Sequence, residues 1–242
     1  MGCLICTTSP TVKSHILPRA LFHAMKREGQ QLVAGRKDGP GYRVLQSGEW
    51  DDRLLCAEHE AALGGFDRYG VEFCREAKRQ MDSGKRALEI PNPKPRALVG
   101  FACACIWRYA ASRSGGRPER ALGPYAQRLK EVLFEASDFS PLLLVSRHAY
   151  EIDAGETMNL AMLPHIYNEE ELRFWRFIVC GLIFDLKLDN RPPPPAMATL
   201  AVNDLAEIHL FEDFPQKIMR QPALARSLQR MYRPPARTRR GR

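Results

Sequence analysis

The fold is decided by the segment WDDRLLCAEHE at residues 50–60, which ends in a Cys56-x-x-His59 pair. A second pair, Cys3-x-x-Cys6, opens the chain. Two short-range pairs of this kind bring sulfur and imidazole donors to tight turns or helix starts, as a tetrahedral structural zinc site requires. We therefore predict that Cys3, Cys6, Cys56 and His59 bind zinc. The alternative, unrelated buried cysteines, accounts for one pair more easily than for two.

Between the two pairs lies the segment SHILP at residues 14–18, and a hairpin pattern follows it. The order of Cys pair, Ser-His-Ile-x-Pro, hairpin and Cys-x-x-His-Glu resembles the HNH endonuclease superfamily. The resemblance covers about residues 3–80, a third of the chain. It implies a zinc-bound treble clef with a ββα active site, in which the zinc only holds the scaffold.

The resemblance also implies a role for each matching residue. His15 matches the first His of the family, the general base that takes a proton from the attacking water, and an imidazole suits this role because its pKa lies near neutral pH. Asp51 falls where the family usually has the Asn that orients this His. Glu60 falls where the family usually has its last His, a ligand of the catalytic ion, here Mg²⁺ or Mn²⁺, which accept carboxylate oxygen. The implied catalytic residues are His15, Asp51 and Glu60.

The chain departs from the family pattern at Ser14. Many members have an acid or a His there as a second metal ligand, whereas a Ser hydroxyl is a weak ligand. Asp67 lies seven residues beyond Glu60, close to two helical turns, so the two carboxylates can share a face and Asp67 can replace that ligand. The alternatives are a solvated helix face for Glu60 and Asp67, and an ordinary polar strand end for His15.

The composition is that of an ordinary globular protein, with 45% hydrophobic and 26% charged residues in 242 residues. This length fits one large or two small domains. Three prolines within residues 91–95 suit an extended connector better than the interior of an element. We expect an α+β protein with an HNH-like zinc domain at residues 1–90, a larger α+β domain at 96–220 and a basic tail at 221–242.

Local patterns predict the main elements. A turn rich in Gly and Asp at residues 35–41 separates two strand-like runs, at 31–34 and 42–46, and predicts a hairpin. Apolar residues near helical spacing predict a helix from 57 to about 83, although its three glycines weaken the pattern. Further helices are expected at about 96–113 and 118–136, and strands at 142–145, 160–163 and 174–188.

The positive charge is concentrated at the C-terminus. The formal net charge is +8, and residues 214–242 alone contribute +9, since they contain one Lys, eight Arg and no acid. Guanidinium groups bind phosphate oxygens and release counterions, so this segment predicts nucleic-acid binding, with double-stranded DNA as the expected target. RNA, an anionic membrane or mere solubility are the alternatives. The arginines concerned are Arg233, Arg237, Arg239, Arg240 and Arg242.

The seven cysteines are an odd number in a chain large enough to need no disulfides, so we expect thiols or metal ligands. No apolar run reaches the roughly 18 residues of a membrane span, and no signal-peptide pattern opens the chain. The sequence therefore predicts a soluble, cytoplasmic protein.

The leading hypothesis is a metal-dependent HNH-like endonuclease that cuts phosphodiester bonds. Its expected protein partners are a second copy of the chain, in a homo-oligomer, or a protein that activates cutting. The alternative is a non-catalytic zinc module that binds nucleic acid or protein, and Ser14 and Glu60 are the departures that favour it. A third possibility is an assembly protein whose larger C-terminal region carries the main function.

Overall fold

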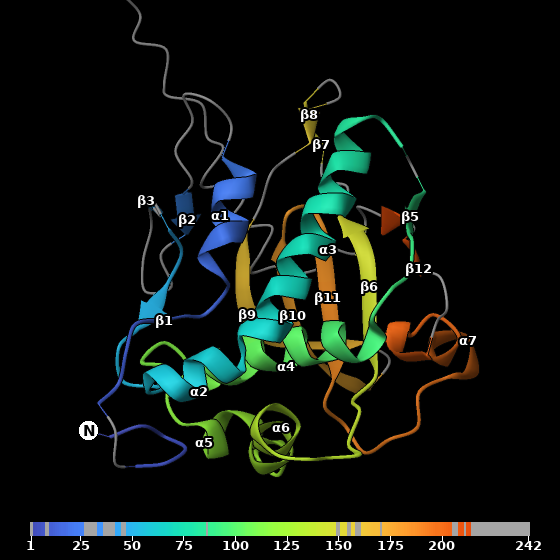
Figure 1. Ribbon diagram of the computed structural model, residues 1–242. Coiled ribbons are helices and arrows are strands. Elements are labelled where there is room, and N and C mark those ends of the chain that lie inside the picture. The colour runs from blue at the N-terminus through green and yellow to red at the C-terminus, as the bar shows by residue number, and fades with distance from the viewer. Residues whose placement is uncertain are drawn as a thin grey trace, which may run out of the picture.

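The computed structural model describes residues 2–7, 10–26, 33–35, 42–44, 47–85, 87–148, 151–153, 156–157, 161–169, 171–204, 208–210 and 212–213. The described helices are α1 (Arg19–Met25), α2 (Ala57–Ala62), α3 (Gly64–Asp82), α4 (Pro95–Ala111), α5 (Pro118–Leu122), α6 (Tyr125–Phe134) and α7 (Pro195–Ala198), with one 3-10 turn at Val202–Asp204. Helices α3 and α4 pack against each other and lie over the main sheet (Figure 1).

The main sheet has five strands in the order β13-β6-β11-β10-β9. All neighbours are antiparallel except β13 and β6, which are parallel. Its strands are β6 (Leu143–His148), β9 (Met162–Glu169), β10 (Leu172–Val179), β11 (Leu182–Lys187) and β13 (Glu212–Asp213). Short two-stranded pairs surround it, formed by β1 (Ser14–His15) with β4 (Trp50–Asp51), β2 (Val33–Gly35) with β3 (Tyr42–Val44), β5 (Leu88–Ile90) with β12 (Ile208–Leu210), and β7 (Glu151–Asp153) with β8 (Glu156–Thr157).

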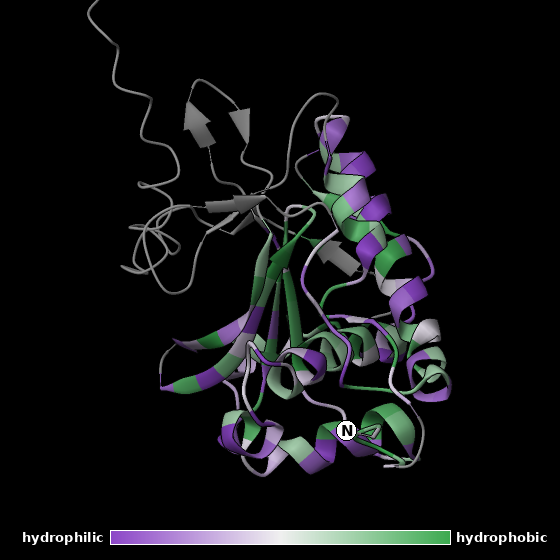
Figure 2. Cartoon of the chain, turned by 90° about the vertical axis from the view of Figure 1, so that its left-hand side faces the viewer, coloured by the Kyte–Doolittle hydropathy of each residue, from purple (hydrophilic) through white to green (hydrophobic). Residues whose placement is uncertain are grey.

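Helix α4 forms the centre of the core. The helix is apolar around most of its circumference, as expected for a helix buried on all sides. The Phe101 ring centre lies 5.9 Å from that of Phe177 and 5.6 Å from that of Phe184. These two phenylalanines are cross-strand partners in β10 and β11, and their rings stack with centres 4.7 Å apart. Figure 2 shows the central strands of this sheet as mostly hydrophobic, whereas the helices carry many hydrophilic residues.

Helices α3 and α4 approach closely because each has a glycine facing a phenylalanine of the other. A Cβ atom added at Gly70 would lie 2.3 Å from the ring of Phe101, and one added at Gly100 would lie 2.4 Å from the ring of Phe66. The glycine at position 70, which weakens the helix pattern in the sequence, is thus the residue that admits the Phe101 ring to the core.

The structure confirms the α+β class and most of the predicted elements. The hairpin is present as β2 and β3, paired from Val33↔Val44 to Gly35↔Tyr42. The helix predicted from 57 to about 83 consists of α2 and α3, which join at Leu63.

Two predicted elements are each divided by a glycine. The helix expected at 118–136 is interrupted at Gly123, whose φ of 57° lies outside the helical region, and forms α5 and α6. The strand expected at 174–188 is a hairpin of β10 and β11, which turns at Cys180 and Gly181 with positive φ at both.

The buried core continues across residues 91–95, where the domain boundary is predicted. Two separate domains stay a prediction. One cluster of buried residues joins Leu54 and Leu63, before the prolines, to Leu98 and Phe177, after them. In the described part of the chain, no helix has both the length and the apolar character needed to cross a membrane. The predicted tail at 221–242 lies outside the described residues.

Candidate metal centre and the adjoining polar cluster

Backbone hydrogen bonds bring the two Cys and His pairs of the sequence together. The N–H of Leu4 donates to the carbonyl of Leu54 over 2.9 Å, and the N–H of Val12 donates to that of Leu55 over 2.8 Å. The N-terminal turn with Cys3 and Cys6 is therefore held beside the segment that leads into α2. Cys56 is the residue before α2 and His59 lies within it, so a single turn of helix presents both side chains to the N-terminal turn.

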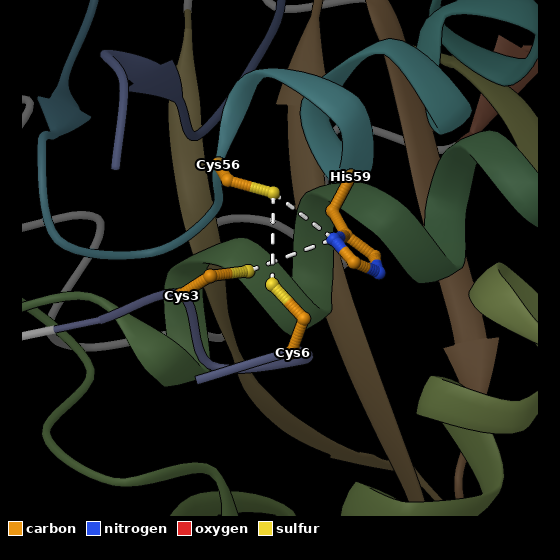
Figure 3. A group of neighbouring side chains, drawn as sticks. All are labelled: Cys3, Cys6, Cys56 and His59. Carbon is orange, nitrogen blue, oxygen red and sulfur yellow. Dashed lines mark hydrogen bonds between the residues drawn. The ribbon is translucent and has the colours of Figure 1, made fainter. Parts of the chain in front are cut away.

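The four side chains converge on one point (Figure 3). Their ligand atoms all lie within 4.8 Å of one another. Cys56 Sγ is 3.1 Å and Cys3 Sγ 3.7 Å from His59 Nδ1, and Cys6 Sγ is 3.9 Å from Cys56 Sγ. A tetrahedral zinc ion with ordinary bond lengths sets its ligand atoms about 3.5–3.8 Å apart. The four predicted ligands therefore fit a metal ion such as zinc, with no fifth position required.

A second cluster lies directly beyond the last of these ligands, and it is centred on an arginine. Arg108 of α4 has a side chain only 1% exposed. Its Nη1 and Nη2 donate to the two carboxylate oxygens of Asp67 over 2.9 and 2.8 Å, and Nη2 also donates to Glu60 Oε1 over 3.0 Å. Such forked, charge-assisted bonds offset the cost of burying the guanidinium. Glu60 and Asp67 thus do share a face, as predicted, and Arg108 lies between them.

The second oxygen of Glu60 is also occupied. The buried Ser14 hydroxyl donates to Glu60 Oε2 over 2.8 Å. Burial raises the pKa of Glu60, although the positive charge of Arg108 and the bond from Ser14 oppose this rise. Ser14 is therefore a hydrogen-bond donor to the carboxylate that follows the metal centre. It holds β1 to α2.

The predicted catalytic ion does not fit this arrangement. Glu60 and Asp67 direct their oxygens to Arg108 and Ser14, so an ion there would have to displace a guanidinium. Both acids nevertheless keep some contact with solvent, with side chains 25% and 21% exposed. A divalent ion at Glu60 and Asp67 stays a prediction that this geometry does not support.

His15, the predicted general base, lies at the end of β1. Its Nε2 atom is buried and has no hydrogen-bond partner within the part of the chain that the structure describes. Burial lowers the pKa of His15, and the charges of Lys13, Arg19 and Arg108 lower it further, while that of Asp67 raises it. The imidazole is therefore neutral at pH 7, which is the form that accepts a proton.

Asp51, which the resemblance expects to orient His15, forms its hydrogen bonds with Arg53 and Arg113. Its carboxylate accepts the backbone N–H of Arg53 over 3.0 Å and that of Arg113 over 2.9 Å, and these bonds lower its pKa although burial opposes them. The Ser14↔Asp51 pairing in β1 and β4 places it beside Ser14. The contacts of Asp51 join β4 to the end of α4, and an orienting role toward His15 stays a prediction.

Sequence reasoning did not identify Arg108 as part of this site. Its signal in the sequence is that it is the one charged residue among residues 97–112, an otherwise uncharged and largely apolar stretch. A buried arginine there needs acidic partners. The five tail arginines expected to bind nucleic acid lie outside the described residues.

Comparison of the chain with known protein families, curated proteins and solved structures finds no match. The family resemblance therefore depends on the matching residues themselves.

Proposed function

We propose that this protein is an HNH-like endonuclease that hydrolyses phosphodiester bonds of nucleic acid, with a zinc-bound treble clef as its scaffold. The observation that carries the proposal is the position of His15, a partly buried imidazole at the end of β1 beside the cluster of Glu60, Asp67 and Arg108. In this proposal His15 accepts a proton from the attacking water. A neutral imidazole held away from other partners is suited to that step.

Two further features support the proposal. The metal centre fits zinc, which when bound would fix the N-terminal turn against α2 and so fix the position of β1. Lys13 and Arg19 lie near enough to His15 to lower its pKa, so positive charge is present where a phosphate would approach. DNA is the proposed target, and the basic C-terminal tail supplies the charge for binding it without reading its sequence.

The test is cleavage of plasmid DNA and of a single-stranded RNA by the whole protein and by His15→Ala. His23→Ala is the matched control, because His23 is an exposed histidine on the neighbouring helix α1. We expect cleavage to fall by about 100-fold or more in His15→Ala, the typical contribution of a general base, and to be unchanged in His23→Ala. Equal cleavage by the wild type and His15→Ala would exclude His15 as the base. Each reaction is run with Mg²⁺, with Mn²⁺ and without added ion, because Arg108 binds the two carboxylates expected to hold the divalent ion.

One observation favours a second candidate, a non-catalytic zinc module that binds nucleic acid or protein. Arg108 binds both carboxylates that would hold a catalytic ion. If this candidate is right, the purified protein binds zinc and duplex DNA, and cleaves no substrate under any of the ion conditions. Cleavage that depends on His15 would exclude it.

A further inference from the structure

We infer that Trp50 is a stacking surface for an unpaired nucleobase, so that the site takes single-stranded nucleic acid. This inference rests on the proposed function and adds to it the strand form of the substrate. It starts from the position of the one exposed tryptophan among the described residues, since Trp50 is 47% exposed whereas Trp107 and Trp175 are buried.

Trp50 is placed beside the proposed base by the register of the small sheet. His15 and Trp50 are directly paired in the antiparallel strands β1 and β4. Side chains at such paired positions emerge on the same face, with Cβ atoms about 4.5–5.5 Å apart. The indole ring and the imidazole therefore lie on the same face of the small sheet. A single exposed aromatic residue is common on protein surfaces, so the inference depends on the pairing of Trp50 with His15.

The charges around the indole ring suit a nucleotide. The Lys13 ammonium lies over the Trp50 ring, 4.2 Å from the ring centre, so a base stacked on that face takes the place of this cation–π contact. Lys13 and Arg19 are both exposed. Arg53 and Arg113, with side chains 42% and 59% exposed, contact Asp51, the residue after Trp50 in β4. An aromatic surface bordered by cations binds a base through its ring and the adjoining phosphate through charge, independently of sequence.

The same features exclude a paired base as the occupant. In a duplex each base is covered above and below by its neighbours, so an indole ring can reach a base face only where the strand is unpaired. Double-stranded DNA would be held by its phosphates alone, and Trp50 would add nothing to its binding. The strand form of the substrate therefore decides whether Trp50 matters.

The test uses the fluorescence of the whole protein. Trp50 is the exposed emitter of the three tryptophans, and a base stacked on its ring quenches it. The probes are an oligothymidylate of about 12 nucleotides, the corresponding oligouridylate, and a duplex of equal length. We expect saturable quenching by both single strands and none by the duplex. Trp50→Ala should bind the single strands about fivefold more weakly or worse, since stacking contributes about 1–3 kcal/mol per base.

Two further variants serve as controls. Trp50→Phe keeps an aromatic ring and should recover most of the affinity, measured by anisotropy of a labelled strand. Leu200→Ala removes another exposed apolar side chain, 61% exposed and distant in sequence, and should bind as the wild type does. Unchanged single-strand binding by Trp50→Ala, or quenching by the duplex equal to that by the single strands, would overturn the inference.

The inference and the proposed function fail separately. Cleavage that needs His15 but is indifferent to Trp50→Ala would leave the nuclease proposal intact and overturn the stacking surface. Quenching at Trp50 without cleavage by any protein preparation would support the stacking surface and overturn the nuclease. Absence of both would overturn both.

Discussion

At the scale of single residues, Arg108 determines what the acidic side chains near the metal centre do. Two carboxylates beside one guanidinium leave a net charge of −1, and the hydroxyl of Ser14 satisfies a remaining oxygen. The arrangement joins α2, α3, α4 and β1 through one buried cation. Arg108 is thus a structural counterion in a place where the family resemblance expects a metal ion.

We expect Arg108→Met to destabilise the protein by about 3 kcal/mol, because it leaves two partly buried carboxylates without their counterion. Urea unfolding followed by circular dichroism measures the loss. The triple variant Glu60→Gln, Asp67→Asn, Arg108→Met removes all the charges and should recover much of the stability. If Arg108→Met alone were as stable as the wild type, the ion pairs would be unimportant to folding.

The proposed base gives a prediction about pH. Below its pKa, His15 is an imidazolium that cannot accept a proton, and above its pKa the neutral form can. Burial, Lys13, Arg19 and Arg108 lower the pKa of His15 from its usual value of 6.5, so kcat/KM should be half-maximal below pH 6.5 and level at neutral pH. Lys13→Gln removes one positive charge and should move the midpoint upward, whereas Lys85→Gln should not. A midpoint above 6.5 in the wild type would contradict this assignment.

At the scale of elements, the N-terminal turn is held beside α2 by a few backbone bonds, by packing of Ile5 against the core and by the candidate metal ligands. It is too short to form a core of its own. We expect one zinc per chain by elemental mass spectrometry, and none in Cys6→Ser. Loss of zinc should lower stability by about 4 kcal/mol where free zinc exceeds its Kd a thousandfold. Cys74→Ala, which alters a buried thiol of α3, should keep its zinc, and zinc binding by Cys6→Ser would show that the ligand set is wrong.

The contact between α3 and α4 gives a matched pair of glycine variants. Gly70→Ala places a methyl group within the Phe101 ring, which is itself packed against Phe177 and Phe184, so we expect a loss of about 1–3 kcal/mol. Gly65→Ala adds its methyl group to open space and should gain about 0.5 kcal/mol from helix propensity. Chemical denaturation of both variants tests this. Equal effects at the two positions would mean that the helices are not so closely packed.

The local patterns of the sequence were sufficient for most of the predicted elements and for the group of candidate metal ligands. Cys-x-x-Cys and Cys-x-x-His spacing depends on a single turn of chain, and the long helices follow from apolar periodicity. The partners of Asp51, Glu60 and Asp67 could not be predicted in this way, because Arg108 lies in α4 and Arg113 just after it, far along the chain. Long-range contacts of this kind are set by packing between elements, which periodicity does not record.

At the scale of the whole molecule, the N-terminal third, where the resemblance to HNH endonucleases lies, shares one core with the rest of the chain. Helix α3 buries Val71, Phe73, Cys74 and Ala77, and Phe73 meets Phe184 of the sheet with ring centres 6.4 Å apart. Arg108 adds an ionic contact between the same two regions. The larger region therefore completes the folding of the proposed catalytic unit, in addition to any role it has in target selection or assembly.

This shared core predicts that residues 1–90 do not fold alone. The isolated fragment would expose the apolar face of α3 and leave Glu60 and Asp67 without Arg108. We expect the fragment with zinc to show no cooperative thermal transition and to bind a hydrophobic dye, whereas the full chain unfolds in one transition with little dye binding. Adding the segment 91–134, which contains α4 to α6, should restore part of the order because it returns Arg108 and Phe101. A fragment of residues 1–90 that unfolded cooperatively with zinc would instead establish the domain boundary at the prolines of residues 91–95.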